Sequence, residues 1–238
     1  MELKSKTAII TGGSKGIGFG VARALMQNGI KVAITSRNID SAENAINKLS
    51  SETGVEGLAL EADVRNYKSQ QNAVRQVIEK WGQLDILIAN AGIGHFGFIE
   101  DLSLEQWHET IDTNLTGVFY SIKACVEELK KSEGYFISIS SLAGENFFAG
   151  GSAYNASKFG VTGFTQAVML DLRQKGINVS TIMPGSVSTY FNNHEPNPDD
   201  AWKIQTEDIG ELVVNLLKMN KRALPSKIEI RPARPPQK

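Results

Sequence analysis

Tyr154 and Lys158, in the sequence YNASK (154–158), lie four residues apart and carry a phenol and an ammonium. If this stretch is helical, the two side chains lie on the same face, one turn apart. A free tyrosine has a pKa of about 10 and transfers protons poorly at neutral pH. An ammonium at about 4 Å favours the phenolate by about 4 kcal/mol at an effective dielectric constant near 20, which would make the phenol an effective proton donor and acceptor. The alternative is an ordinary pair on a helix surface, and the pentapeptide alone does not decide between the two.

A second candidate for chemistry is the glycine-rich stretch TGGSKGIG (11–18), which opens a helical period at 17–28. Its glycines allow the backbone to turn tightly, to approach a pyrophosphate and to pack the helix against the sheet. The start of the helix then offers unpaired N–H groups to the phosphates. A plain structural turn would use the same residue type, but the position between the first strand and the first helix predicts a dinucleotide site.

The elements that must position these residues alternate along the whole chain. Short apolar runs predict strands at 7–11, 31–35, 56–61, 85–90, 135–140, 178–183 and 227–231. Helical periods cover 17–28, 40–51, 67–81, about 104–131, about 153–174 and 207–220, and Gly29 and Gly176 follow two of them as helix-ending residues. This alternation predicts a doubly wound α/β Rossmann fold, a parallel sheet of about seven strands with helices on both faces. We expect a single domain over 1–238, with an irregular polar insertion at 192–200 and a tail at 232–238.

Composition narrows the function classes. The 238 residues are 41% hydrophobic and 21% charged, with a formal net charge of −1, so nothing favours nucleic acid or an anionic membrane as a partner. The single cysteine, Cys125, lies in a helical run and is expected to pack there. His95, His108 and His194 show no metal-ligand spacing, so we expect no metal. We see no signal peptide and no apolar run long enough to span a membrane, and we therefore expect a cytoplasmic protein.

Further motifs follow the predicted elements in order. They are Asp63-Val64 after the third strand, Asn90-Ala91-Gly92 after the fourth, Asn114 in the next helix, Ser141 after the fifth strand and Pro184-Gly185 after the sixth. Together with TGGSKGIG and YNASK, they make the chain resemble the short-chain dehydrogenase/reductase family over nearly its whole length. One departure is Ala89, where the family usually has asparagine; we expect it to alter hydrogen bonds of the central sheet and to leave the chemistry unchanged.

The resemblance implies catalytic roles for Asn114, Ser141, Tyr154 and Lys158. Tyr154 would donate a proton to a carbonyl oxygen as hydride reaches the carbon, and Ser141 would polarise that oxygen. The family's serine lies thirteen residues before its tyrosine, which selects Ser141 over Ser140. Lys158 would lower the pKa of Tyr154 and bind the nicotinamide ribose, and Asn114 would hold a water that links Lys158 to solvent. Taken singly, each residue has a structural alternative: a surface pair, a strand-end cap and a polar residue inside a helix.

The resemblance also implies a cofactor. The family reads the adenosine ribose at the end of the second strand, where NAD-binding members usually have an aspartate. This chain has Ser36 followed by Arg37, which suits a 2′-phosphate, and Lys15 in the glycine-rich loop could reach the same group. Asp63 would accept a hydrogen bond from the adenine amino group and Val64 would pack on the ring. We therefore expect NADP, with NADPH preferred over NADH.

The expected cofactor-binding residues are Gly12, Ser14, Lys15, Gly16, Ile17, Gly18, Ser36, Arg37, Asn38, Asp63, Val64, Asn90, Ala91, Gly92, Tyr154, Lys158, Pro184, Gly185, Val187 and Thr189.

The substrate is expected to meet the segments 92–100, 142–151 and 186–205, where Phe96, Phe147, Phe148, Tyr190 and Phe191 suggest a partly apolar pocket. The alternative is that these aromatic residues serve packing or subunit contacts, as they often do in exposed loops of the family. The core motifs match 3-oxoacyl-carrier-protein reductases, but the ending LPSKIEIRPARPP looks more like that of 3-hydroxy acid dehydrogenases. We expect an oxidoreductase acting on a 3-oxoacyl or 3-hydroxy acid type of substrate, that is, on a small-molecule carbonyl or alcohol. The alternatives are a sugar or polyol dehydrogenase of the same family, and a non-catalytic NADP-binding regulator.

Family members commonly pair the helices that carry Asn114 and Tyr154. Both helices have more apolar positions here than one buried face needs: Val118, Phe119, Ile122, Val126, Phe159, Phe164, Val168 and Leu172. We therefore expect a homotetramer or a homodimer.

Overall fold

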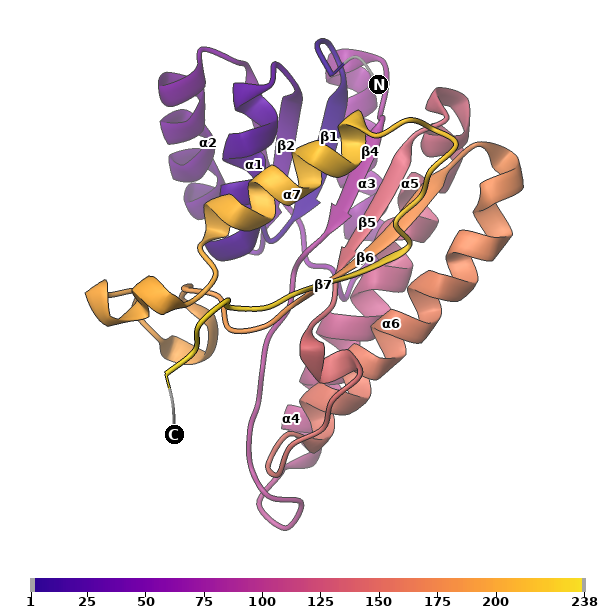
Figure 1. The fold of residues 1–238 in the computed structure, drawn as a ribbon. Coiled ribbons are helices and arrows are strands. Elements are labelled where there is room, and N and C mark those ends of the chain that lie inside the picture. The colour runs from indigo at the N-terminus through magenta and orange to yellow at the C-terminus, as the bar shows by residue number, and fades with distance from the viewer. Residues whose placement is uncertain (1–2, 237–238) are drawn as a thin grey trace.

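The computed structural model describes residues 3–236, which form a seven-stranded sheet in the order β3-β2-β1-β4-β5-β6-β7 with every neighbouring pair parallel (Figure 1). The strands are β1 (Thr7–Thr11), β2 (Lys31–Ser36), β3 (Gly57–Glu61), β4 (Ile86–Ala89), β5 (Tyr135–Ile139), β6 (Asn178–Pro184) and β7 (Lys227–Ile230). The strand order reverses between β1 and β4. The carboxyl ends of these two strands therefore flank a crevice, the place where open α/β sheets bind ligands.

Helices cover both faces of the sheet, as the doubly wound prediction requires. They are α1 (Gly16–Gln27), α2 (Ile39–Thr53), α3 (Tyr67–Trp81), α4 (Leu104–Ile111), α5 (Gly117–Ser132), α6 (Ser152–Leu172) and α7 (Thr206–Lys218). Helices α1, α2 and α7 pack on one face, and α3, α5 and α6 pack on the other (Figure 1). In β1, Ala8 and Ile10 pack into the core on the face covered by α1, α2 and α7, and Ile9 packs into the core on the face covered by α3, α5 and α6. Burial of the strands on both faces explains why their sequences are nearly continuously apolar. The predicted fold class is confirmed.

One predicted element was wrong in detail. The expected helix over about 104–131 is divided into α4, a π-helical turn at Asp112–Thr116, and α5. The reason is tertiary. The side chain of Asn114, inside the turn, bonds both the N–H and the carbonyl of Ile93, and Gly117 packs so closely that a Cβ there would lie 2.8 Å from Val64. A π-helical turn inside an α-helix commonly marks a functional site.

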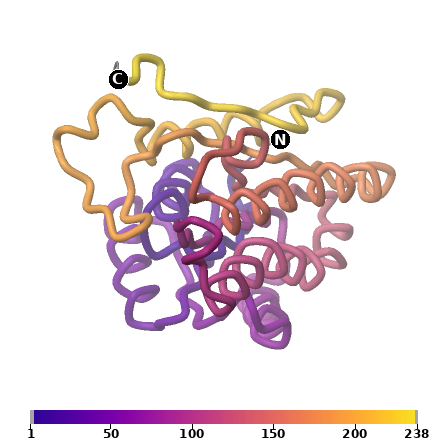
Figure 2. Tube along the Cα trace, turned by 90° about the horizontal axis from the view of Figure 1, so that it is seen from below, coloured from indigo at the N-terminus to yellow at the C-terminus, as the bar shows by residue number. Residues whose placement is uncertain are grey.

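Other expectations agree with the structure. Gly29 and Gly176 end helical segments with φ of +80° and +78°. The polar insertion lies in a loop of two short helical turns, Phe191–Asn193 and Pro198–Trp202, and it projects from the side of the molecule in the view of Figure 2 (orange). The part of the predicted tail that lies within the described residues, 232–236, contains neither helix nor strand; residues 237–238 lie outside the described residues.

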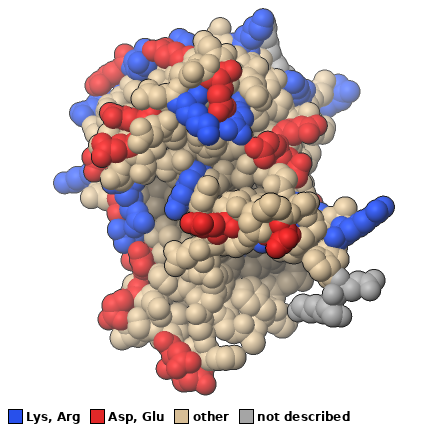
Figure 3. All heavy atoms as spheres, turned by 90° about the vertical axis from the view of Figure 1, so that its left-hand side faces the viewer, with Lys and Arg blue, Asp and Glu red and all other residues tan. Residues whose placement is uncertain are grey.

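Charged side chains are unevenly distributed over the face of the molecule in Figure 3. Basic and acidic side chains are interspersed on the upper part of the face in Figure 3, and its lower part is largely uncharged. No helix within residues 3–236 is both long and apolar enough to cross a membrane.

Candidate active site

Tyr154 and Lys158 lie in the first two turns of α6, beside the carboxyl end of β5. Lys158 is only 5% exposed, and its Nζ donates a hydrogen bond of 3.0 Å to the carbonyl of Ile139, the last residue of β5. The same Nζ lies 5.7 Å from the centre of the Tyr154 ring. The two residues are therefore neighbours inside the protein, and the surface-pair alternative is excluded.

Ser141 and Ser140 take different roles after β5. The hydroxyl of Ser140 is buried, shares a 2.8 Å hydrogen bond with Thr162 and donates to the carbonyl of Lys158. The side chain of Ser141 instead lies near enough to the phenol of Tyr154 to lower the pKa of that phenol, and its hydroxyl accepts the N–H of Ala143 at 3.1 Å. Ser141 is thus both the partner of Tyr154 and the cap of a short turn, so the strand-end-cap alternative is part of its role.

The protonation of this pair differs from the sequence expectation. Burial raises the pKa of Tyr154, and the side chain of Ser141 opposes that rise. Burial also lowers the pKa of Lys158 from 10.5 to about 8. The expected lowering of the tyrosine pKa by the ammonium is therefore wrong for the ligand-free protein. The physical reason is that Lys158 Nζ faces the ring and the Ile139 carbonyl, while the phenol is surrounded by apolar groups.

Asn114 is placed beside this pair by the π-helical turn. Its Oδ1 accepts the N–H of Ile93 at 2.8 Å, and its Nδ2 donates to the Ile93 carbonyl at 2.9 Å and to Ser157 Oγ at 3.0 Å. A Cβ at Gly92 would lie 3.3 Å from Asn114 Oδ1 and 3.7 Å from Lys158 Nζ, so both groups converge on that glycine. Because an amide oxygen has two lone pairs, the second one on Oδ1 is where the expected water would bind.

The glycine-rich loop closes on the segment after β4. Gly12 and Gly16 have φ of +63° and +59°, and a Cβ at Gly12 would lie 3.0 Å from the Cα of Ala91. A Cβ at Gly18 would lie 2.5 Å from Asn90 Nδ2. The same Nδ2 donates to the carbonyls of Thr11 and Gly12 at 2.9 and 3.0 Å. Asn90 thus fixes the loop from the neighbouring strand.

Helix α1 begins without a side-chain cap, unlike α2, α3 and α4. Its N-cap residue is Lys15, whose side chain makes no capping bond, whereas Asn38, Asn66 and Ser103 cap α2, α3 and α4. The first N–H groups of a helix have no partner within it, so those of α1 remain available at the carboxyl edge of the sheet. A Cβ at Gly16 would lie 3.6 Å from Thr189, which places the start of the loop after β6 across from them. This uncapped start, with Ser14 in the preceding turn, fits the pyrophosphate of a dinucleotide.

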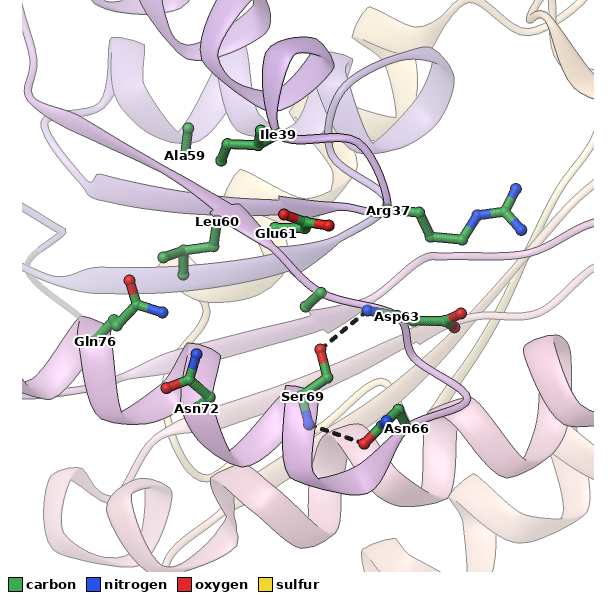
Figure 4. A pocket seen from close by; sticks show the side chains of 11 residues that line it. Arg37, Ile39, Ala59, Leu60, Glu61, Asp63, Asn66, Ser69, Asn72 and Gln76 are labelled. Carbon is green, nitrogen blue, oxygen red and sulfur yellow. Dashed lines mark hydrogen bonds between the residues drawn. The ribbon is translucent and has the colours of Figure 1, made fainter.

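The adenosine end of the expected site borders a pocket of about 600 Å³ beside the outer strand β3 (Figure 4). Arg37 and Asp63 line it, and their side chains extend in the same direction (Figure 4). The rest of the lining comes from Ile39 of α2, from β3 with the residues after it, and from α3 with its N-cap Asn66, and none of these residues is among the expected site residues. Arg37 is 61% exposed, and its guanidinium lies 3.9 Å from the carboxylate of Glu109.

Sequence reasoning missed Arg65, two residues after Asp63. Its guanidinium bonds the Asp63 carboxylate, at 2.6 Å for the shortest contact, and holds the pKa of that carboxyl below its usual range. The signal was the arginine in DVRN, which follows the motif directly. Asp63 therefore has a charged partner already.

Other expected cofactor residues have structural roles. The Asn38 side chain accepts the N–H of Ser41 to cap α2, and the Ser36 hydroxyl accepts the N–H of Asn38. Val64 is buried against Gly117. Near β6, Gly185, which follows Pro184, donates its N–H to Ile230, and Val187 pairs with Ile204 in a parallel bridge.

Metal-ligating side chains and the single cysteine are the other candidates for chemistry in residues 3–236. No group of three or more His, Cys, Asp or Glu side chains among them is arranged to hold a metal ion. Cys125 is buried in α5, and burial raises the pKa of its thiol. An un-ionised thiol is a poor nucleophile, which agrees with a packing role.

The sheet, the uncapped glycine-rich helix start and the buried tyrosine–lysine pair define a Rossmann-type oxidoreductase. Residues 6–200 match the family described as short chain dehydrogenase. The chain belongs to the short-chain dehydrogenase/reductase family.

Individual relatives agree with this assignment. The trans-4-hydroxycyclohexanecarboxylate dehydrogenase of Sinomonas cyclohexanicum is 38% identical over 227 residues, which cover 90% of this chain and 86% of the relative. A 3-oxoacyl-[acyl-carrier-protein] reductase of Synechocystis is 35% identical over 79% of this chain and 76% of the relative. The chain also matches the glycine betaine reductase ATRR of Emericella nidulans at 31% identity, but it spans only 19% of that longer protein.

Among solved structures, the chain resembles an alcohol dehydrogenase of the archaeon Thermococcus sibiricus, complexed with 5-hydroxy-NADP. The TM-score is 0.91, the identity is 31%, and the alignment covers 98% of this chain and 99% of the other.

Proposed function

We propose that this protein is an NADP-dependent reductase of 3-oxo compounds that, in the reverse direction, oxidises 3-hydroxy acids and similar secondary alcohols. The observation that carries the proposal is the arrangement around Tyr154. Its phenol lies beside Ser141 and its ring faces the buried Lys158, at the carboxyl edge that also bears the glycine-rich helix start.

The chain's own residues would handle the proton, while the bound cofactor supplies the hydride. Tyr154 donates its phenolic proton to the carbonyl oxygen; the phenol is protonated at neutral pH, and its raised pKa makes it a weak acid in the ligand-free protein. Ser141 donates a hydrogen bond to the same oxygen. Lys158, with a pKa of about 8, exchanges protons readily near neutral pH and would return one to Tyr154, with the water held by Asn114 linking it to solvent. All four residues are present and adjacent, which argues against a non-catalytic regulator.

The cofactor would lie across the crevice between β1 and β4. The N–H groups at the start of α1 would bind its pyrophosphate, and Lys158 its nicotinamide ribose. Ser36 and Arg37 favour NADP over NAD, because the neutral serine does not repel a 2′-phosphate and the exposed guanidinium can pair with it. Lys15 would add a second positive charge. Asp63 would face the adenine amino group while held by Arg65.

Two features support a 3-oxo or related carbonyl substrate. Relatives named 3-oxoacyl-[acyl-carrier-protein] reductase and trans-4-hydroxycyclohexanecarboxylate dehydrogenase both act, by their names, on compounds that combine an oxo or hydroxy group with an acyl or carboxyl group. In addition, Phe96 and Phe191 lie next to Tyr154, with ring centres 5.3 and 5.6 Å away. Apolar rings suit an acyl substrate better than a sugar or polyol, so that alternative is not favoured.

We further propose that the 238 residues act as one domain, in the cytoplasm, and assemble through α5 and α6 into a homotetramer or homodimer. Phe119 on α5 and Phe159 on α6 are 44% and 43% exposed, which a partner subunit would cover. Sedimentation at micromolar concentration should give a species of two or four chains; a single species of 25.9 kDa would contradict the assembly.

The activity is tested with ethyl 3-oxobutanoate, NADPH and the purified wild-type protein, with the absorbance of NADPH as the readout. Sorbitol with NADP⁺ is the matched alternative substrate. The proposal expects reduction of the 3-oxo ester and little oxidation of sorbitol. Oxidation of sorbitol without reduction of any 3-oxo ester would favour the polyol assignment instead.

A further inference from the structure

Two phenylalanines pack against the ring of the proposed proton donor, and a third packs against one of them. The Phe96 ring lies 5.3 Å from that of Tyr154, and the Phe191 ring lies 5.6 Å from it. Phe96 also contacts Phe148 at 6.0 Å and Phe191 at 6.2 Å, the latter edge to face. The three residues come from three separate segments, after β4, before α6 and after β6. We call Phe96, Phe148 and Phe191 the phenyl cluster.

Two glycines make room for the phenyl cluster. A Cβ at Gly94 would lie 2.6 Å from Phe191 Cζ and 2.8 Å from Phe96 Cε2. A Cβ at Gly151 would lie 2.5 Å from Phe148 Cε2. Neither glycine has a positive φ, so the backbone conformation does not require glycine at either position. Glycine is required instead because the phenyl rings pack too closely to leave room for a Cβ.

The loop after β6 holds Phe191 over Tyr154. The next two residues, Asn192 and Asn193, take left-handed conformations, and the N–H of His194 returns to the Phe191 carbonyl at 3.2 Å. His194 in turn is bonded to Asp200.

Asp200 anchors this loop through its buried carboxylate. It is 5% exposed, and its carboxylate pairs with Lys203 at 2.5 Å and accepts the Ser188 hydroxyl at 3.2 Å. The Asp200 carboxylate therefore links the turn that carries Phe191, through His194, to Ser188 near the start of the loop and to Lys203 near its end.

The phenyl cluster is nevertheless open to solvent. Phe96, Phe148 and Phe191 are 41%, 49% and 37% exposed, far more than the rings of a folded core. Apolar rings that are fixed in place and partly wet gain free energy when another apolar group covers them. Since Phe96 and Phe191 adjoin Tyr154, a molecule whose carbonyl Tyr154 protonates lies where it can cover them.

We propose that the phenyl cluster is a subsite for a six-membered hydrocarbon ring attached next to the reacting carbonyl, so that the substrate is an aryl or cyclohexyl ketone or the matching alcohol. Aromatic side chains recognise such rings by edge-to-face and offset contacts, which an ethyl or methyl group makes poorly. The proposal rests on the proposed role of Tyr154 and narrows the 3-oxo substrate to one that carries a ring.

The first test measures binding without turnover. Titration calorimetry of the NADPH-loaded wild-type protein, in which the reduced cofactor cannot oxidise an alcohol, gives dissociation constants for 1-phenylethanol and for butan-2-ol, which differ only in carrying a phenyl or an ethyl group. We expect 1-phenylethanol to bind at least about tenfold more tightly. Equal binding of the two alcohols would overturn the proposal.

Variants then assign the preference to the phenyl cluster. Phe96→Ala should bring the ratio of the two dissociation constants to within about threefold of unity. Phe96→Leu should give a ratio between that of Phe96→Ala and that of the wild type. Phe147→Ala is the matched control, because Phe147 is 86% exposed, adjoins Phe148 in sequence and makes no ring contact with the phenyl cluster among the described residues. A ratio that stays at the wild-type value in Phe96→Ala would overturn the assignment, whether or not the variant turns over substrate.

A kinetic comparison separates this proposal from the 3-oxo assignment. Ethyl 3-oxo-3-phenylpropanoate is compared with ethyl 3-oxobutanoate, and acetophenone with butan-2-one, each with NADPH. A higher kcat/KM for the ring-bearing member of both pairs supports the subsite. If neither ester is reduced while acetophenone is preferred, the 3-oxo assignment fails and the subsite stands. If the esters are reduced without preference for the ring, the subsite fails and the 3-oxo assignment stands.

Discussion

Lys158 Nζ lies 5.7 Å from the centre of the Tyr154 ring and donates its hydrogen bond to the Ile139 carbonyl, not to the phenolic oxygen. Lys158 is buried and Tyr154 is partly buried, and burial shifts both pKa values toward the neutral forms. In the ligand-free protein Tyr154 is therefore an uncharged proton donor, and the neighbouring Lys158 is a weaker base than a lysine in water. We infer that a positively charged nicotinamide would be needed before the phenolate becomes accessible for oxidation.

Burying Lys158 should cost folding stability. Its pKa falls from 10.5 to about 8, so the unfolded chain binds the proton more tightly and the cost is fully present below pH 8. Stability from this group should then rise between about pH 8 and pH 10.5. Lys158→Met should raise the free energy of unfolding at pH 7 by up to about 3 kcal/mol, less what the lost hydrogen bond contributed. Urea unfolding at pH 7 and pH 10 measures this.

The matched control for that experiment is Lys68→Met, an exposed lysine on α3. It should leave the free energy of unfolding unchanged within about 0.5 kcal/mol at both pH values. If Lys158→Met is less stable than the wild type at pH 7, or its advantage does not shrink toward pH 10, the buried lysine is not strained in the way described.

NADPH preference should depend on Arg37. A charge-assisted hydrogen bond contributes about 1.5–3 kcal/mol, equivalent to about ten- to more than a hundredfold in affinity. Arg37→Ala should raise the KM for NADPH at least about tenfold and leave that for NADH nearly unchanged. Ser36→Asp should go further and favour NADH, because it adds an acceptor for the ribose hydroxyls and repels a 2′-phosphate.

Arg75→Ala, which removes a 69% exposed guanidinium from α3, controls for the loss of one positive charge. It should leave both Michaelis constants unchanged. Equal losses for NADPH and NADH in Arg37→Ala would mean that the arginine supports the loop and does not read the phosphate.

Asn90 should support cofactor binding through the glycine-rich loop. Its Nδ2 donates to two carbonyls of that loop, and its removal leaves both without this partner. Asn90→Ala should weaken NADP⁺ binding about tenfold, since loss of such bonds costs about 1–3 kcal/mol. Fluorescence titration with NADP⁺ measures the dissociation constant, and Asn72→Ala on α3 is the control. An unchanged dissociation constant would show that the loop holds its shape without Asn90.

Local patterns predicted the scaffold well, because β1, α1 and the glycine-rich loop depend on apolar periodicity and on a few glycines. The division of the helix at Asp112–Thr116 was not predictable, since it depends on hydrogen bonds between Asn114 and Ile93, twenty-one residues apart. Among the predicted aromatic residues, spacing could not separate Phe148, which contacts Phe96, from its fully solvated neighbour Phe147.

The site could be located from motifs, but its electrostatics could not. The direction of the Tyr154 pKa shift depends on how much apolar surface the folded chain packs around the phenol. The pairing of Asp63 with Arg65 likewise depends on the turn after β3, which the sequence alone does not define.

The most direct test of the central claim, that Tyr154 is the proton donor, is to measure Tyr154→Phe in parallel for NADPH binding and for turnover of ethyl 3-oxobutanoate. The change removes one hydroxyl and little volume. We expect a dissociation constant for NADPH within about threefold of wild type and a fall in kcat of about 10²–10⁴-fold, the usual contribution of a general acid. A variant that binds NADPH normally and keeps more than about a tenth of the wild-type kcat would contradict the account.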